Sequence, residues 1–517
     1  MNKRAVFYLS SLLLFVMGCA MMTVVPVAIL MKDPESVVLQ SFLCALAVCI
    51  VSGFIFFRTR RRKNEPEFKT GVREGFLAVS CAWIGAVLVG ALPFLLIGGF
   101  VFSDAFFESA SGLTTTGASV IESETILASG EKLTGGLESL PAGLLYWRSL
   151  LNWLGGVGIV VFVLLIIPLF NPGQSGQQLY NAEVPGLKTS SEQTTPRLVS
   201  SVRIILFVYL MLTMLSFFCY WVGGMSFFDA VCHSFSTVST GGFSTKTASI
   251  GFYQNSFLQW CCIVFMFFSA CNFALIVRLF VSRRFHYFKD EEFRFFSLLI
   301  LCATLLIAGM LYVNCPDGFQ GTNGNTIPRS IESCLRTAAF QVVTIITTTG
   351  YVTSDYVAWG IPAALMILFL LMFPCGCGGS TSGGMKCVRV YLVFKLVLSE
   401  IRHCVFPRAI PDIRLNRERL NSAVISKMMA FLFLYLIIFL LVGAILPFLA
   451  GMDMTTAFAA SLACLSNIGP GMGKVAPSET YFWMSDSAKF LLSFTMIAGR
   501  LELYTCLVLF LPSFWKR

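Results

Sequence analysis

Charged and histidine side chains are scarce in this sequence. Of its 517 residues only 12% are Asp, Glu, Lys or Arg, whereas 56% are hydrophobic. A soluble chain of this length could not cover so much apolar surface with so few polar groups. The low charge therefore excludes an ordinary soluble protein.

The sequence also lacks the side-chain clusters that bind transition metals or catalyse reactions. The three histidines, His233, His286 and His403, are far apart, and Cys375 and Cys377 have neither zinc spacing nor companion ligands. Most of the 18 cysteines lie in apolar segments, where a free thiol behaves as a small hydrophobic group. We therefore expect no catalytic residues and no organic cofactor in this chain.

Apolar runs long enough to cross a bilayer recur along the whole chain. A crossing needs about 20 apolar residues. The runs lie near residues 5–31, 37–57, 76–100, 144–170, 201–223, 256–281, 296–313, 358–374, 424–450 and 487–512. No small-residue cleavage site ends the first run, so we interpret it as a membrane helix rather than a secretory signal. The sequence predicts an all-α polytopic membrane protein with ten crossings of a lipid bilayer.

Basic residues lie on alternate connections between these runs. They cluster within 58–63, 283–284, 402–419 and 516–517. Because short loops rich in Lys and Arg stay in the cytoplasm, this pattern predicts that both termini are cytoplasmic. The formal net charge of +10 then orients the chain in its membrane. We expect no nucleic-acid partner.

Four short polar strings, each centred on a glycine, interrupt the apolar background. We align Gly117, Gly241, Gly350 and Gly469, which recur at intervals of about 110 to 125 residues. Each string follows a segment of about three helical turns and lies between two full spans. The sequence predicts four pseudo-repeats of span, pore helix, filter loop and span around one pore, after two extra N-terminal spans. The expected boundaries are 1–65 for the N-terminal pair and 66–180, 196–285, 288–400 (with a broken last span) and 415–517 for the repeats.

The short segments are expected to be half-helices that enter from the outside and end in the middle of the membrane. Ser103 with Asp104, Ser226 with Asp229, and Asp453 are candidate caps at their starts. A helix C-terminus carries about half a negative charge, so four converging ends favour a cation. Non-helical backbone at that depth is tolerated where it lines a water-filled path or is packed in protein.

The loops themselves have the chemistry of a cation filter. Their backbone carbonyls can replace the water shell of a dehydrated ion, and glycine allows the required backbone conformations. Ordinary extracellular turns also contain Thr, Ser and Gly, but four strings in register favour the pore interpretation. The candidate ligands of K+ ions are Thr115, Thr116, Gly117, Ser239, Thr240, Gly241, Thr348, Thr349, Gly350, Asn467, Ile468 and Gly469.

The order of these elements resembles the Trk/Ktr/HKT superfamily of potassium transporters, and three strings resemble its TrkH branch. The strings lie at 104–117, 153–158 and 378–386. The resemblance covers essentially the whole chain. It implies a subunit of a bacterial inner membrane that forms a homodimer and binds a cytoplasmic, nucleotide-binding regulatory ring (TrkA-like). Glycine at all four aligned positions implies potassium rather than sodium, although Ile468 and Pro470 depart from the pattern in the fourth loop.

The resemblance also assigns roles to two features below the filter. One is a flexible intramembrane gate formed by Gly378, Gly379, Ser380, Thr381, Ser382, Gly383 and Gly384, for which a passive helix kink is the alternative. The other is Arg500, which matches a residue in the permeation path. An unpaired charge in a span costs at least about 3 kcal/mol, so Arg500 should face the pore or an acid such as Glu502. Glu108 and Arg336 are expected to brace the pore helices.

The leading hypothesis is a potassium uptake subunit, which conducts K+ down its electrochemical gradient and catalyses no reaction. A Na+-permeable protein or a cation-coupled carrier of the same membrane class is the alternative. Such carriers are commonly built from inverted repeats, whereas these repeats all run in the same direction. A polytopic membrane enzyme is the least favoured hypothesis, because no acidic or His/Cys cluster lies near an interface.

Overall fold

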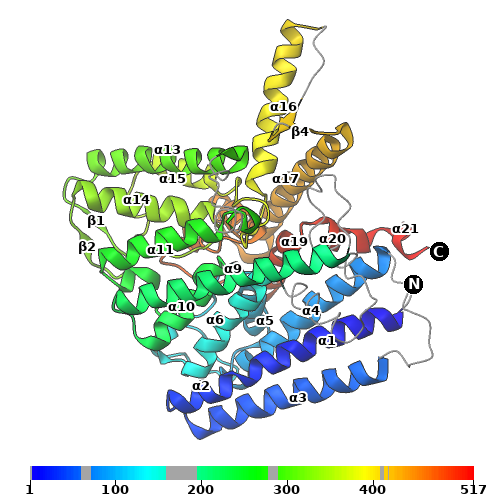
Figure 1. Cartoon of the computed structure of the whole chain (residues 1–517). Helices are drawn as coiled ribbons and strands as arrows, with labels where there is room; N and C mark the ends of the chain where they lie inside the picture. The colour runs from blue at the N-terminus through cyan, green and yellow to red at the C-terminus, as the bar shows by residue number, and fades with distance from the viewer. Residues whose placement is uncertain are drawn as a thin grey trace.

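The computed structural model describes residues 3–59, 72–158, 195–276, 289–407, 413–416 and 418–516. Within these residues the chain forms many helices and two small hairpins. Figure 1 shows long helices running side by side, with both chain ends at the same end of the bundle. A common end for the two termini is what an even number of crossings requires.

The first helices lie at the edge of the bundle. They are α1 (Lys3–Met22), α2 (Val24–Leu30) and α3 (Glu35–Thr59). Thr23 interrupts the predicted first span between α1 and α2, where its hydroxyl donates to Ala20 O at 2.6 Å. On α3 the side chains of Phe54 and Phe57 are 70% and 71% exposed, as expected of a helix that faces lipid.

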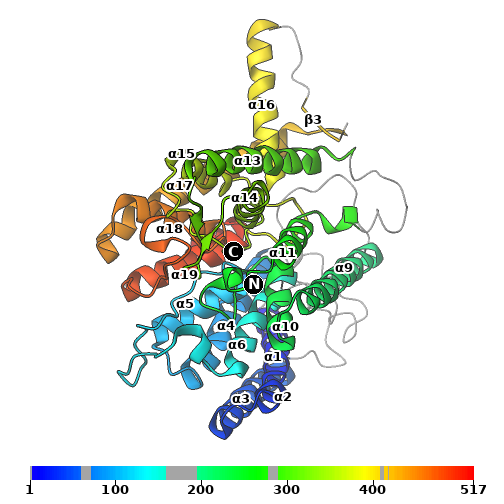
Figure 2. The ribbon, with the colours of Figure 1, turned by 90° about the vertical axis from the view of Figure 1, so that its left-hand side faces the viewer.

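Most of the remaining helices form four units, each with a span, a short helix and a second helix, and unit 3 has one further helix. Unit 1 is α4 (Val72–Leu96), α5 (Phe102–Leu113) and α6 (Ala142–Val157), and unit 2 is α9 (Thr195–Val222), α10 (Phe227–Val238) and α11 (Ser256–Ser269). Unit 3 is α13 (Glu291–Asn314), α14 (Ile331–Ile346), α15 (Pro362–Leu371) and α16 (Cys387–Val405), and unit 4 is α17 (Ser422–Ala450), α18 (Met454–Leu465) and α19 (Asp486–Arg500). Figure 2 shows the units in chain order around a common centre, with α16 projecting away from the bundle.

Six helices among the described residues are long and apolar enough to cross a membrane. The first of these spans is α1 together with α2, the second is α3, and the other four lie in the first helix of each unit. The helix that follows the short helix in each unit is shorter than the first helix of that unit. The prediction of an unbroken span at 487–512 is wrong, because the chain turns through 114° between Arg500 and Tyr504. The predicted run at 358–374 yields only the ten-residue α15. Parts of the runs at 144–170 and 256–281 lie outside the described residues.

Short elements complete the described chain. The 3₁₀ helices are η1 (Gly136–Ser139), η2 (Ser249–Phe252), η4 (Gly473–Val475) and η5 (Val508–Phe510), and two short α-helices are α20 (Tyr504–Leu507) and α21 (Pro512–Trp515). Strands β1 (Phe319–Gln320) and β2 (Thr326–Ile327) pair antiparallel with Phe319 opposite Ile327. Strands β3 (Arg414–Leu415) and β4 (Glu418–Arg419) pair antiparallel with Arg414 opposite Arg419.

The short helices α5, α10, α14 and α18 occupy the interior of the bundle. In α5 every residue after Phe102 is buried, and in α18 the residues from Ala459 to Leu465 are buried. The loops that follow these helices, which we number 1 to 4 after their units, are also buried, although they are rich in Thr, Ser and Asn. The interior of the molecule is therefore polar at its centre and apolar toward the lipid.

Candidate functional site: four loops that close a ring

Three of the four short helices begin at a polar cap. Ser226 Oγ accepts a hydrogen bond from Asp229 N at 3.0 Å, and Asp453 Oδ2 accepts one from Thr456 N at 3.1 Å. Ser330 caps α14 through a capping box. These bonds satisfy amides that a helix start leaves free, and they confirm the predicted caps Ser226 and Asp453.

The predicted cap of α5 is wrong. This helix begins after Val101, which makes no side-chain cap. Ser103 Oγ donates instead to Asp486 Oδ1 at 2.7 Å. Asp104 forms a buried ion pair of 2.6 Å with Lys489. Both side chains bind α5 to α19, and so they join units 1 and 4.

All four short helices end in the same backbone conformation. The C-cap residue is followed by a non-glycine residue of positive φ, which costs about 1–2 kcal/mol. Those residues are Thr115 (55°), Thr240 (54°), Thr348 (58°) and Asn467 (57°). Two residues further on the chain has a glycine of positive φ, which is Gly117 (81°), Gly242 (72°), Gly350 (81°) or Gly469 (94°). The residue between them donates its amide to the last turn of the helix, in the pairs Thr116–Ser111 (2.9 Å), Gly241–Ser236 (2.8 Å), Thr349–Thr344 (2.9 Å) and Ile468–Ala463 (2.8 Å).

The second loop therefore differs in register from the sequence alignment. Gly242 occupies the position of Gly117, and Gly241 occupies the position of Thr116. In the sequence Gly241 follows a threonine, as Gly117 and Gly350 do, and so it aligns with them. The backbone decides otherwise, since the positive φ and the close approach to the next loop both fall on Gly242.

The four loops close a ring around one centre. Each ring glycine approaches the carbonyl oxygen of the residue that precedes the ring glycine in the next loop. A side-chain carbon added at any of the four would lie at most 2.5 Å from that oxygen, in the order Gly117 to Gly241 O, Gly242 to Thr349 O, Gly350 to Ile468 O, and Gly469 to Thr116 O. The last contact returns to loop 1. No residue with a side chain fits these positions without a shift of the backbone.

A polar side chain supports each of the first three loops. It lies six residues before the C-cap of the short helix and contacts the outgoing arm of its own loop. The pairs are Glu108 with Ser119 (3.1 Å), His233 with Ser244 (3.0 Å) and Gln341 with Ser354 (2.9 Å). These contacts link the short helix to the arm that follows its loop.

An ion pair between Arg148 and Glu108 links the support of loop 1 to loop 2. Arg148 Nε lies 2.5 Å from Glu108 Oε1, and both side chains are less than 5% exposed. Arg148 Nη1 donates to Ser244 O at 2.8 Å, and the guanidinium carbon lies 3.6 Å from the centroid of the Phe243 ring. Glu108 is thus a brace, as expected, and its charge is paired.

The fourth loop is held differently. Ala460 occupies the supporting position and offers no polar group. Instead, the hydroxyl of Tyr481 donates to Gly469 O at 2.7 Å, and the hydroxyl of Tyr356 donates to Gly471 O at 2.6 Å. Tyr356 follows loop 3, so the fourth loop depends on residues outside its own short helix.

A non-helical segment, the intramembrane loop (residues 373–386), lies against the C-terminal end of α10 and against the third and fourth loops. The break is longer than a bend within one helix, because α15 ends at Leu371 and the next helix begins only at Cys387. Gly383 N donates to Thr348 Oγ1 at 2.9 Å, and Thr381 Oγ1 donates to Val238 O at 3.0 Å. All seven predicted gate residues belong to this segment.

Arg500 connects the intramembrane loop to unit 1. Its guanidinium donates to Thr381 O and to Gly155 O, each at 2.6 Å. Glu502, the predicted acidic partner, pairs with Arg389 at 2.5 Å. Gly155 also shows why α6 needs small residues, since an added side-chain carbon would collide with Leu113 O at the end of α5.

Helix α13 also binds the intramembrane loop. Glu292 Oε1 accepts hydrogen bonds from Gly378 N at 2.7 Å and from Val388 N at 3.2 Å. Glu292 is buried. The segment is thus bound at Gly378 by a carboxylate and at Thr381 by a guanidinium.

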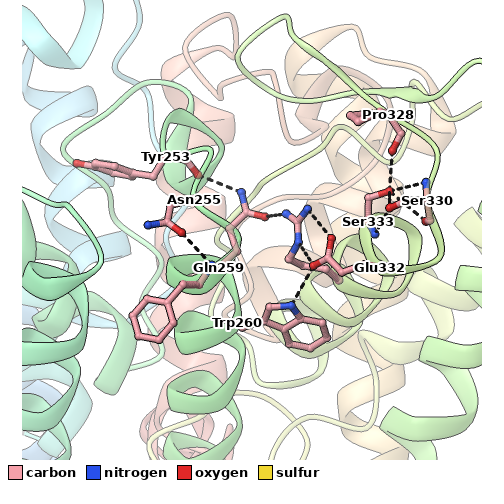
Figure 3. A network of polar contacts seen from close by, with 10 residues as sticks. Tyr253, Asn255, Gln259, Trp260, Pro328, Ser330, Glu332 and Ser333 are labelled. Atoms are coloured by element: carbon pink, nitrogen blue, oxygen red, sulfur yellow. Dashed lines mark hydrogen bonds and ion pairs between the residues drawn. The ribbon is translucent and has the colours of Figure 1, made fainter.

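A separate polar network braces unit 3 against unit 2 (Figure 3). Arg336 Nε pairs with Glu332 Oε1 at 2.7 Å, and Arg336 also donates to Gln259 Oε1. Trp260 Nε1 donates to Glu332 Oε1 at 3.1 Å, and Gln259 Nε2 donates to Tyr253 O at 3.0 Å. Arg336 is therefore a packing brace, as the sequence suggested.

Comparison with known proteins identifies the family. The model of the TrkH family, described as a cation transport protein, matches residues 39–517. The chain is 36% identical to the Trk system potassium uptake protein TrkH of Vibrio parahaemolyticus and 34% identical to that of Escherichia coli K12, with full coverage of both chains in each case. The crystal structure of the potassium transporter TrkH from Vibrio parahaemolyticus superposes with a TM-score of 0.83 at 32% identity, again over both whole chains. The chain belongs to the TrkH family.

Membership of the TrkH family confirms the predicted fold class and the predicted class of activity. The protein is an all-α, multi-pass membrane protein, and it belongs to a family of transporters rather than enzymes. Among the described residues no group of three or more His, Cys, Asp or Glu side chains could hold a metal ion. Oxygen atoms of the backbone and of hydroxyl and amide side chains are the ligands that this TrkH-family ring can offer a cation.

Sequence reasoning missed several residues of the TrkH-family site. Gly242 was one position away from the chosen glycine. Arg148 could have been found, because a lone arginine inside an apolar run is costly and must have a partner. Tyr481 and Tyr356 lie in connecting segments with no periodic pattern, and nothing in the sequence marks them.

Proposed function

We propose that this TrkH-family chain is a potassium uptake subunit that conducts K+ through the ring of four loops. The observation that carries the proposal is the closed sequence of approaches between each ring glycine and the carbonyl oxygen of the next loop. Such a ring presents backbone oxygens at equivalent heights, and oxygens so arranged can replace the hydration shell of K+. The corrected set of ring residues includes Gly242 in place of Gly241 at the glycine level.

The electrostatics of the ring favour the binding of a cation. The C-terminal ends of α5, α10, α14 and α18 meet at the loops, and each carries a partial negative charge. Thr115 Oγ1 and Asn467 Oδ1 are buried oxygens without a hydrogen-bond partner in the described part of the chain. The nearby carboxylate Glu108 is neutralised by Arg148. Dipoles rather than a fixed negative charge would then attract the ion.

Potassium is the ion that the relatives favour. The proteins of Vibrio parahaemolyticus and Escherichia coli bear the name Trk system potassium uptake protein, and TrkG of Escherichia coli, 32% identical over the whole chain, bears a corresponding name. A Na+-permeable ring is the second candidate, and one observation favours it. Ile468 and Asn467 replace the threonines of loops 1 and 3, so the fourth loop is chemically unlike the others.

We propose that the intramembrane loop gates this pathway. Its residue Thr381 contacts the C-terminal end of α10, just before loop 2, and its residue Gly383 contacts loop 3. Arg500 would act as a barrier, since its positive charge lies beside the same segment and repels a cation that leaves the ring. Release of the loop from Arg500 and Glu292 would open the path.

We propose the partners and location that the family resemblance implies. These are a homodimer in the bacterial inner membrane, a cytoplasmic nucleotide-binding regulatory ring (TrkA-like) and cytoplasmic termini. Helix α16 supports a further protein contact, because it projects from the bundle in Figures 1 and 2 and exposes Phe394, Val397 and Ile401. The common end of both termini supports the proposed topology.

Flux measurements in proteoliposomes test the proposal. The purified chain is reconstituted alone and with its regulatory ring, and uptake of K+, Rb+, Na+ and Li+ is followed in parallel. We expect K+ and Rb+ to enter and Na+ and Li+ to be largely excluded. Equal uptake of Na+ and K+ would favour the second candidate, and no uptake of any cation would refute conduction.

A further inference from the structure

Tyr481 distinguishes the fourth loop at the level of the ring itself. Among the described residues, Gly469 is the one ring glycine whose carbonyl oxygen accepts a hydrogen bond. The donor is the hydroxyl of Tyr481 at 2.7 Å. The carbonyl oxygens of Gly117, Gly242 and Gly350 accept no hydrogen bond from any described residue. The outer layer of the ring is therefore chemically asymmetric.

The position of this hydroxyl is fixed from two sides. Tyr481 N donates to Ser119 O at 2.9 Å, which ties the residue to the outgoing arm of loop 1. Its ring packs against Phe107 of α5 with a centroid separation of 5.5 Å. Tyr481 is 2% exposed. The backbone and the ring of Tyr481 thus place its buried hydroxyl within hydrogen-bond distance of Gly469 O.

We propose that Tyr481 is a specificity-determining residue of the ring. A hydrogen bond donated to a carbonyl places a partial positive charge beside its oxygen and weakens the field that this oxygen offers an ion. A small, strongly hydrated ion such as Na+ needs a stronger field than K+ to exchange water for protein oxygens. The weakened carbonyl of Gly469 therefore favours the larger ion. This inference rests on the proposed conduction of K+ through the ring.

Tyr356 provides a matched control for the role of Tyr481. It is also a buried tyrosine, 1% exposed, and its hydroxyl donates to a carbonyl of the same arm at 2.6 Å. Its acceptor is Gly471, two residues beyond the ring glycine. Loss of either hydroxyl removes one neutral hydrogen bond from the fourth loop. Only the loss at Tyr481 changes a carbonyl of the ring.

The test compares Tyr481→Phe, Tyr356→Phe and the parent chain in proteoliposomes. The K+/Na+ permeability ratio and the K+ concentration of half-maximal uptake are measured, with the melting temperature of each preparation. For Tyr481→Phe we expect the ratio to fall roughly threefold to tenfold, which is the effect of one neutral hydrogen bond. The half-saturating K+ concentration should also fall, because the freed oxygen binds the ion more strongly. Tyr356→Phe should keep the ratio of the parent.

Each other result overturns the inference. A selective parent with an unchanged Tyr481→Phe ratio shows that the hydroxyl does not tune the ring. An equal fall in both variants assigns the effect to looser packing of the arm, and so does a changed ratio in a Tyr481→Phe protein that melts far below the parent. A parent that carries no cation refutes the proposed function itself, and it is recognised before any variant is compared.

Discussion

Loops 1 to 3 and loop 4 reach the same ring with different supports. In the first three units a side chain of the short helix itself, Glu108, His233 or Gln341, holds the outgoing arm. In the fourth unit that position is Ala460, and Tyr481 and Tyr356 hold the arm from other segments. The backbone of all four loops is nevertheless the same, from the positive φ after the C-cap to the ring glycine. The ring is thus specified by backbone geometry, and the supports can be exchanged.

Replacement of a ring glycine should have the largest effect of all, and an equal one in every loop. In Gly350→Ala the added carbon would lie within 2.5 Å of Ile468 O, so the backbone of two loops must move. We expect K+/Na+ discrimination to fall by at least about tenfold, because carbonyl positions set selection. Flux of both ions in proteoliposomes measures this.

The control for that variant is Gly130→Ala. Gly130 has a similar φ of 84°, but nothing lies within 4 Å of the added carbon. An alanine at position 130 has the backbone strain but no collision, so the K+/Na+ selectivity of Gly130→Ala should equal that of the parent protein. A Gly350→Ala protein with parental flux and selectivity would contradict the ring.

Removal of the charged support should be the next largest effect. Glu108→Ala leaves Arg148 buried without its carboxylate, which typically costs about 3–5 kcal/mol of stability. The melting temperature in detergent should fall strongly, and Glu108→Ala combined with Arg148→Met should recover part of the loss. Glu124→Ala removes an exposed pair with Lys132 and should change little. An unchanged melting temperature in Glu108→Ala would show that loop 1 needs its support no more than loop 4 does.

Replacement of Arg500 should change the rate of K+ flux rather than the K+/Na+ selectivity. Unit charges about 4 Å apart interact by roughly 4 kcal/mol in a partly wet site, and Arg500 also holds Thr381 O of the intramembrane loop. Arg500→Ala should therefore raise K+ flux in the absence of the regulatory ring and keep the K+/Na+ ratio. Arg294→Ala, an exposed charge on α13, is the control. A silent, poorly folded Arg500→Ala protein would identify Arg500 as a structural brace instead.

The neutral support of loop 3 should have the smallest effect. Gln341→Leu removes the hydrogen bond of 2.9 Å to Ser354 O, and a neutral bond contributes about 1 kcal/mol. We expect a small fall in melting temperature and an unchanged K+/Na+ ratio. A loss as large as that of Glu108→Ala would mean that the supports differ in more than charge.

Part of the architecture could be read from the sequence, because it depends on local composition. The apolar runs predicted the long helices, and the polar strings predicted four interruptions, since unsatisfied backbone is tolerated in a membrane only inside protein. The caps Ser226 and Asp453 were found because a cap acts on its own helix. The cap of α5 was missed because Ser103 and Asp104 bind a helix nearly 400 residues away in sequence.

The sequence by itself determined the membrane class, the fourfold repeat and the family, because hydropathy, glycine spacing and the strings that resemble the TrkH branch are all read from the order of residues in the chain. The tertiary structure decided which glycine of the pair Gly241 and Gly242 belongs to the ring, since both residues allow the turn and only the next loop distinguishes them. It also decided that Arg500 binds carbonyls while Glu502 pairs with Arg389. These choices depend on atoms of other units, and hydrogen bonds and ion pairs form only where folding brings such atoms within about 3 Å.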